Sequence, residues 1–429
     1  MKKTIDHILR PFQYRNYRLF FVGQSIAING TWMSLAALSW LTYRLTHDPV
    51  SLGLLMFYKQ APTFFLSPFG GVLVDHISRR RLIVIAQLID AVTMTGLGVV
   101  TLLERVDVWQ VYMACAVMGV TKSFELPARQ ALVVDIVEDR EHMSNAIALN
   151  STIFHSARLI GPMLAGSLVI PWMGEGLCFL LHAVFCGIAV RCFAELRPRP
   201  MALRKDPGSV LGQMREGFSY AFGFPPVRDL LILMIVLSLF GQAYNTLLPV
   251  FAETILGGDA RTYGFLLSAT GLGAVLSSLR LASRKSVLGL GTVIYQSVLV
   301  FGVALVLFSR TESVAAALVL QFFAGMAGIQ VFVGTNTIIQ TLVNDELRGR
   351  VMSLMGMVFM GAMPLGSLMY GRAAEPLGVQ QTVMAGAVIC MGAGLLFRLR
   401  LPALRRMALP VYAERGIITP EAPPLFPRP

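Results

Sequence analysis

Long, uninterrupted runs of apolar residues are the feature that most constrains this chain. Residues 19–41 and 82–103 are two examples, and each run is close to the roughly 20 residues that an α-helix needs to cross about 30 Å of hydrocarbon. Because hydrophobic residues make up 55% of the 429 positions and charged residues only 14%, there is too little polar surface to cover a water-soluble globule of this size. The sequence therefore predicts an all-α membrane protein rather than a soluble enzyme.

Apolar length, together with charged and Pro-Gly breaks, predicts twelve transmembrane helices. The first six fall at residues 19–41, 52–74, 82–103, 108–125, 145–170 and 177–193. The other six fall at residues 230–251, 263–281, 290–308, 314–335, 351–370 and 379–397. The division predicts four segments, namely an N-terminal six-helix bundle (1–195), a cytoplasmic linker (196–229), a C-terminal six-helix bundle (230–398) and a disordered cytoplasmic tail (399–429).

The net charge of +12 is distributed over the loops between the apolar runs. A nucleic-acid-binding protein would cluster its basic residues on one soluble face, so no nucleic-acid partner is expected. The bias of basic residues toward alternate loops follows the positive-inside rule and predicts a multi-pass protein of the cytoplasmic (inner) membrane with both termini in the cytoplasm. The five cysteines show no Cys-x-x-Cys spacing, so neither a disulfide framework nor a metal site is indicated, and no cofactor is expected.

The predicted linker contains apolar residues at helical spacing. Leu211, Met214, Phe218 and Ala221 recur every three or four positions, which is typical of an amphipathic helix lying on a membrane surface. A plain structural role is favoured for this helix over a site for a partner.

A short loop that mixes one acid with several bases follows the second predicted helix. Residues 71–81 read Gly-Val-Leu-Val-Asp-His-Ile-Ser-Arg-Arg-Arg. Arginines at a membrane edge anchor to anionic headgroups, and a topogenic loop alone would explain them. The loop also resembles the signature of the major facilitator superfamily, Gly-x-x-x-Asp-Arg-x-Gly-Arg-Arg. His76 stands where that signature has a basic residue, and Ser78 stands where it has glycine.

This resemblance implies a latch that gates the interface between the two bundles. In that reading Gly71 allows close helix approach and Asp75 meets charges and a helix end across the interface. Arg79 and Arg80 belong to the same latch. The corresponding place in the second half, residues 282–285, reads Ala-Ser-Arg-Lys and has no acid, so an asymmetric latch is expected.

Further motifs in the first half narrow the resemblance to one branch. Residues 30–33 (Gly-Thr-Trp-Met), 126–131 (Leu-Pro-Ala-Arg-Gln-Ala) and 157–162 (Ala-Arg-Leu-Ile-Gly-Pro) look like the enterobactin-exporter-like branch, which contains exporters of siderophores and drug-like compounds. Gly161 and Pro162 also resemble the glycine-proline motif of antiporters, in which small residues permit tight packing and proline loosens a bending helix. Residues 345–350 and 364–368 echo first-half segments, as two pseudo-symmetric repeats would.

Ionisable residues inside predicted spans are candidates for function, because burying a charge in lipid is expensive. Ser151, His155, Arg158 and Pro162 follow one another at helical spacing and therefore share one face of the fifth predicted helix. Arg158 is predicted to contact a solute or take part in gating, although a structural pairing with a carboxylate or carbonyl would also account for it.

Two other buried charges leave alternatives open. Lys59 either snorkels toward the outer surface or faces a cavity. Asp90 is a candidate proton-coupling site because desolvation favours its protonated form; the alternative is a salt bridge or hydrogen bond to a neighbouring helix.

Charged and amide side chains complete the candidate set. Lys122, Glu125 and Arg129 are spaced to interact on one helix face, and the resemblance implies that Glu125 and Arg129 join Asp75 in the gate. Gln242 and Asn245 are able to hydrogen-bond a solute, but each also suits the role of interhelical contact.

These features predict a proton-coupled secondary transporter that exports a small amphiphilic, siderophore-like or drug-like solute by alternating access. The expected partners are this solute, membrane lipids and protons, and the chain is expected to be monomeric. No Gly-x-x-x-x-Gly-Lys-Ser/Thr motif indicates ATP hydrolysis. A lipid or lysolipid flippase on the same scaffold is the alternative; a membrane-embedded enzyme is less favoured because no Gly-x-Ser-x-Gly or metal-binding pattern occurs.

Overall fold

The computed structural model describes residues 10–137, 142–197, 210–284 and 286–417. The described residues are almost all helical, and none of them forms a strand. Eight of the helical segments are long and apolar enough to cross a bilayer. Their bounds are Arg79–Leu102, Ile170–Ala194, Pro225–Ile255, Ala260–Leu281, Leu290–Arg310, Val314–Leu342, Asp345–Leu377 and Val379–Glu414.

The chain up to Ala194 forms what we call the first helix group. After a short 3-10 turn, η1 (Arg10–Gln13), its helices are α2 (Arg15–Thr46), α3 (Pro49–His76), α4 (Arg79–Leu102), α5 (Val108–Ile136), α6 (Met143–Met163) and α7 (Ile170–Ala194), with a π-helical segment, η3 (Leu164–Val169), between the last two. Helix α3 packs on α5, while α7 packs on α2 and α4. The chain reverses within α7 at Gly174, whose φ of 76° favours glycine.

The remaining helices form the second helix group. They are α8 (Val210–Gly223), α9 (Pro225–Val236), α11 (Ala260–Ala282), α12 (Leu290–Arg310), α13 (Val314–Leu342), α14 (Asp345–Leu377) and α15 (Val379–Glu414). Between α9 and α11 the helix changes type repeatedly, through η4 (π, Leu237–Gln242), η5 (3-10, Ala243–Leu247), α10 (Leu248–Val250) and η6 (π, Phe251–Ile255). Helix α13 packs on α11 and α12, and α15 packs on α12.

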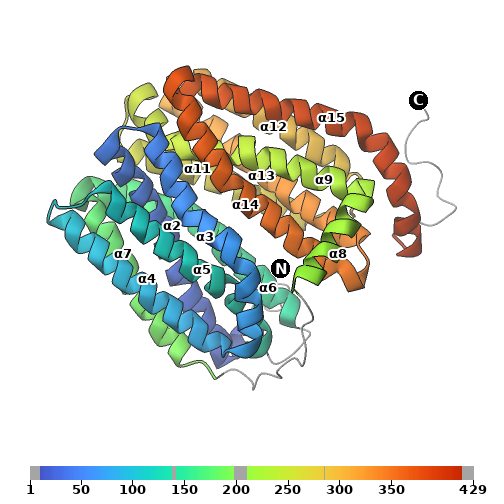
Figure 1. Ribbon diagram of the computed structural model, residues 1–429, viewed down its shortest axis with the longest axis horizontal. Helices are drawn as coiled ribbons and strands as arrows, with labels where there is room; N and C mark the ends of the chain where they lie inside the picture. The colour runs from blue at the N-terminus through green and yellow to red at the C-terminus, as the bar shows by residue number, and fades with distance from the viewer. Residues whose placement is uncertain (1–9, 138–141, 198–209, 285, 418–429) are drawn as a thin grey trace.

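The two groups meet along two helix pairs, α3 with α14 and α6 with α11. We call the end of the molecule that holds Asp48 and Asp259 the contact end, and the end that holds His76 and Asp345 the opposite end. Asp48 and Asp259 are matching N-caps, because each carboxylate accepts hydrogen bonds from the first backbone N–H groups of α3 and α11 respectively. Figure 1 shows α3 and α14 side by side near the contact end and diverging toward α8.

Side chains that join the groups lie at the contact end or near the middle of the helices. The Trp40 ring of α2 stacks on Tyr263 of α11 with centroids 6.1 Å apart, and the Ser268 hydroxyl of α11 donates to the Leu159 carbonyl of α6 over 3.2 Å. Farther along α3, Phe65 and Phe69 are largely exposed. The described cross-group contacts therefore hold one end of the molecule together.

Several boundaries differ from the sequence prediction. Helix α5 continues through Pro127 to Ile136 instead of ending at 125, because Leu132, Val133 and Ile136 bury against α2 and its neighbours. Helix α15 likewise continues to Glu414. The described part of the predicted tail is thus helical rather than disordered, and residues 418–429 lie outside the described residues.

The helix predicted in the linker is present as α8. Its Ala221 is buried and its Phe218 is exposed, while the side chains of Leu211 and Met214 lie outside the description. Gly217 packs against Arg350 of α14, and Glu216 forms an ion pair with the same arginine. The described part of α8 therefore rests on α14.

Candidate functional site

Arg158 lies on α6 where the two helix groups meet. Its guanidinium carbon stands 5.8 Å from the centroid of the Trp32 ring on α2, within the range of a cation–π interaction. The neighbouring backbone packs directly on α11, because a Cβ at Gly271 would lie 2.9 Å from the Leu159 Cα. Arg158 is not among the ion pairs formed by the described residues. Among the described residues, therefore, no carboxylate compensates its charge.

A polar cluster of the second helix group faces the same region. The Tyr244 hydroxyl, which acts electrostatically on Arg158, donates to Gln321 Oε1 over 2.7 Å. The Thr270 hydroxyl donates to the same oxygen over 2.9 Å. Gln321 Nε2 is buried and has no hydrogen-bond partner among the described residues. Since a buried donor without a partner is costly, this amide is a second candidate contact for a polar ligand.

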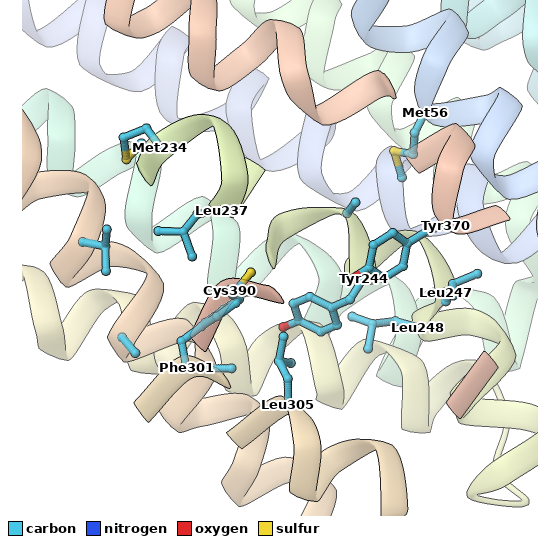
Figure 2. Close-up of a cluster of buried hydrophobic side chains, with 14 of the residues drawn as sticks. Met56, Met234, Leu237, Tyr244, Leu247, Leu248, Phe301, Leu305, Tyr370 and Cys390 are labelled. Atoms are coloured by element: carbon cyan, nitrogen blue, oxygen red, sulfur yellow. The ribbon is translucent and has the colours of Figure 1, made fainter. Parts of the chain in front are cut away.

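Tyr244 is held in place by apolar neighbours from several helices. Figure 2 shows its ring beside Phe301, Leu305 and Tyr370 within one buried cluster. The Phe301 ring approaches edge-on, with centroids 6.2 Å apart. The packing fixes the tyrosine so that its hydroxyl reaches Gln321.

Gln242 and Asn245 lie in the irregular stretch between α9 and α11. Asn245 Nδ2 donates to the Gln242 carbonyl over 2.8 Å, and the Gln242 side-chain amide approaches Gly328 of α13. Both side chains are partly exposed. Non-helical backbone at membrane depth is tolerated where it is buried in protein or lines a cavity, and broken helices mark the binding sites of many transporters.

A second charged cluster lies inside the first helix group. Asp90 of α4 accepts a hydrogen bond from the Thr121 hydroxyl over 2.6 Å and stands 3.2 Å from Lys122 Nζ. The same ammonium donates to Glu125 over 2.5 Å, and Glu125 also pairs with Arg129. Asp90 and Glu125 are almost completely buried. Because these partners compensate the two negative charges, both carboxylates are able to remain in a low-dielectric interior.

Lys59 lies apart from Arg158. Its Nζ is enclosed between helices and has no hydrogen-bond partner among the described residues. The groups that act on it electrostatically are Cys115, Lys122 and Asp90, all within the first helix group. Lys59 thus neighbours the Asp90 cluster, and its ammonium does not snorkel to a surface.

The latch arginines contact the first helix group and the segment that directly follows it. Arg79 pairs with Asp135 of α5 over 2.6 Å, and Arg80 donates to the Leu196 carbonyl over 2.8 Å. Asp75 and Gly71 lie on α3, but their side chains are outside the description, as are those of Ser151 and His155 on α6. The predicted roles of these four residues stay predictions.

Gly161 and Pro162 place α6 against both groups. A Cβ at Gly161 would lie 2.6 Å from the Trp32 Cβ, so this glycine brings α6 against α2. The π-helical segment η3 begins two residues after Pro162, at Leu164, as expected where proline removes a helical hydrogen bond. Within η3, Gly166 contacts Gly264 of α11.

Several partners of the candidate residues were not predicted from the sequence, among them Asp135, Gln87 and Thr121. Asp135 lies beyond the predicted end of its helix, while Gln87 and Thr121 are neutral residues of the kind that commonly line helix contacts. Spacing offers one retrospective signal, because Gln87 and Asp90 are three apart and face the same side of α4. Whether the Thr121 hydroxyl donates to Asp90 depends on how α4 and α5 are rotated about their axes relative to each other. Residue spacing along either helix does not determine that rotation.

The described residues form an all-helical fold with many apolar spans, which is that of a multi-pass membrane protein. The transmembrane secretion effector model of the major facilitator superfamily matches residues 7–414. The chain therefore belongs to this family, and the predicted resemblance is confirmed.

Curated relatives carry efflux and siderophore names. The staphyloferrin A transporter of Staphylococcus aureus is 24% identical over 379 residues, which cover 87% of this chain and 94% of that protein. The multidrug efflux pump Tap of Mycolicibacterium fortuitum is 22% identical over 393 residues, covering 89% and 94%. These relatives are transporters and not enzymes.

Solved structures share the fold at low identity. A bacterial homologue of the lysosomal transporter Spinster, in an inward-facing and occupied conformation, superposes with a TM-score of 0.71 at 14% identity, covering 93% of this chain and 98% of that one. The peptide transporter POT gives a TM-score of 0.75 at 11% identity, covering 92% and 96%.

Proposed function

We propose that the chain is a secondary active exporter of a small amphiphilic solute that carries acidic or catecholate groups. The observation that carries this proposal is Arg158, a guanidinium at the junction of the two helix groups that forms no ion pair among the described residues. A charge held there without a carboxylate is expensive unless it serves a ligand or a gate. The names of two relatives, a staphyloferrin A transporter and a multidrug efflux pump, support a small-molecule solute.

Alternating access is the proposed mechanism. In this proposal the helices make twelve crossings in two six-helix lobes, which are the first and second helix groups. The Gly166–Gly264 contact and the α3–α14 pair close the contact end, and rocking about Arg158 would close the opposite end instead. The positive-inside bias supports a cytoplasmic location for the opposite end and for both termini.

Protons are the proposed coupling ion, and Asp90 is the proposed site. Its carboxylate is fully buried and is matched by one lysine and one hydroxyl. Binding a proton there changes the charge of the protein interior without any loss of packing, which is a requirement for coupling.

Transport into proteoliposomes tests this function. Radiolabelled 2,3-dihydroxybenzoate, a carboxylate with a catechol, and a neutral analogue, catechol, serve as probes under an imposed pH gradient. We expect wild-type protein to move the acidic probe, Arg158→Ala to lower the rate about tenfold or more, and Arg158→Lys to retain an intermediate rate because Lys keeps the charge and loses the planar stack on Trp32. Equal rates for wild type and Arg158→Ala would refute the substrate assignment, and movement of labelled phospholipid instead would identify a flippase.

A further inference from the structure

Ionisable side chains form a column inside the first helix group, in which ion pairs link Asp90, Lys122, Glu125 and Arg129. Its members come from four helices: Lys59 (α3), Asp90 (α4), Lys122, Glu125 and Arg129 (α5) and His182 (α7). At about 1.5 Å per residue, Lys59 lies about 15 Å from the contact-end start of α3 and Arg129 about 32 Å from that of α5. The column therefore extends through roughly half of the bilayer thickness.

Lys122 links the two acids at the centre of the column. Its ammonium stands 3.2 Å from Asp90 Oδ2 and 2.5 Å from Glu125 Oε2. A single cation shared between two carboxylates compensates each of them only partly, so a change at one acid alters the pairing of the other.

The two acids are not equivalent. Glu125 accepts from Lys122 and from Gln87 Nε2 and also pairs with Arg129. Within the described part of the chain, Asp90 has two partners, Lys122 and the Thr121 hydroxyl. Protonating Asp90 therefore breaks one ionic contact, whereas protonating Glu125 would break two, with Lys122 and with Arg129, and would leave Arg129 without an acid among the described residues. Asp90 is the better proton acceptor of the pair.

Orphaned polar atoms lie on both sides of this centre. Lys59 Nζ and His182 Nδ1 are buried without hydrogen-bond partners among the described residues. Toward the opposite end, Gln87 Oε1 and Arg129 Nε are also buried and have no hydrogen-bond partner among the described residues. Buried polar groups that lack protein partners bind internal water, and ordered water between ionisable groups conducts protons.

The column is separate from Arg158. Helices α4 and α5 pack on α3, α7 and α2, whereas the second group is met mainly through α3, α6 and η3. The charged and titratable groups that interact electrostatically with Asp90 all belong to the first helix group. They are Lys122, Glu125, Lys59 and Cys186.

We propose that the coupling proton crosses inside the first helix group, by way of Asp90, while the solute crosses between the groups. A proton from water on one side reaches Asp90 past Lys59, forms an O–H bond on the carboxylate and releases Lys122 to Glu125. Loss of that proton toward Arg129 restores the Asp90–Lys122 pair. The route rests on the proposed transport function, because it supplies the proton that drives it.

Infrared difference spectra during a pH titration of the full chain in lipid test the proton site without any solute. Wild-type protein is expected to show a protonated carboxyl band that is absent in Asp90→Asn and shifted in Thr121→Val. The band persists in Arg158→Ala, because that residue is outside the column, and in Glu175→Gln, a buried acid paired with Arg44 near the contact end. A band that survives Asp90→Asn, or that disappears in Arg158→Ala, overturns the proposal.

Transport of 2,3-dihydroxybenzoate supplies the second readout. In Asp90→Asn, accumulation driven by a pH gradient should fall about tenfold while exchange of labelled for unlabelled probe continues. Lys59→Met should also slow driven uptake more than exchange, and Asp90→Glu should recover part of the driven rate. If wild-type protein moves no probe, the assigned substrate is wrong, and the infrared result still decides the proton site. Driven uptake that is unchanged in Asp90→Asn contradicts the route.

Discussion

Gly166 of η3 and Gly264 of α11 touch backbone to backbone across the two helix groups. A Cβ on Gly166 would lie 2.5 Å from the Gly264 Cα, and one on Gly264 would lie 2.7 Å from the Gly166 Cα. Distances this short exclude any side chain at either position. The same arrangement recurs at the other helix pair, where a Cβ on Gly53 of α3 would lie 2.7 Å from the Ser367 carbonyl of α14.

Gly264→Val is expected to weaken closure of the contact end. The valine would meet the Gly166 backbone, which has no flexible side chain that is able to move away. We expect the transport rate in proteoliposomes to fall about tenfold because one of the two conformations is destabilised. Gly96→Val is the matched control, since a Cβ at Gly96 meets nothing within 4 Å. Equal loss in both variants would contradict a specific role for the contact.

Arg44→Ala should destabilise the contact end of the first helix group. Arg44 donates two hydrogen bonds to Glu175, at 2.9 and 3.2 Å, and the carboxylate is buried while the arginine is half exposed. Removal of the arginine leaves a buried charge, and the partial exposure limits the cost to about 1–2 kcal/mol. Thermal unfolding in detergent micelles measures it. The double variant Arg44→Ala/Glu175→Gln should recover most of the loss; a further decrease would contradict this explanation.

Leu404→Ala tests the continuation of α15 beyond the membrane span. Leu404 is buried together with Leu401 and Ala408, so its truncation should cost about 2–3 kcal/mol of unfolding free energy. Leu399 on the same helix is 76% exposed, and Leu399→Ala should change stability by less than about 0.5 kcal/mol. Similar midpoints for the two variants in thermal unfolding would show that the extension does not pack.

Apolar run length was enough to predict the helical class and most helix positions, because lipid imposes a length on any spanning helix. It failed where burial inside the protein extends a helix beyond the apolar run. Leu401 and Leu404 hold α15 in place among polar and basic neighbours, and Ile136 does the same for α5. Because polar residues are frequent at the ends of these two helices, the apolar pattern does not indicate the buried contacts that stabilise the ends.

The sequence was enough to identify the candidate residues but not to predict which of them lie together. The cost of burying charge identified Arg158, Lys59 and Asp90 from the sequence. Which of these residues lie near one another depends on the direction in which each helix faces. Lys59 lies near Asp90 rather than near Arg158. The partners Gln87 and Thr121 are neutral, so no charge pattern indicates them.

Distances between spin labels test alternating access most directly, because they need no knowledge of the solute. One pair, Arg105→Cys with Glu312→Cys, reports the contact end. The other, His76→Cys with Glu346→Cys, reports the opposite end. All four positions are exposed. Replacing the partly exposed Cys192 by serine leaves only buried native cysteines.

Alternating access predicts two populations whose proportions change with pH, such that the contact-end distance lengthens whenever the opposite-end distance shortens. Gly264→Val should enlarge the population with the longer contact-end distance. Distances that stay fixed, or that lengthen together at both ends, would contradict the rocking of two lobes about Arg158.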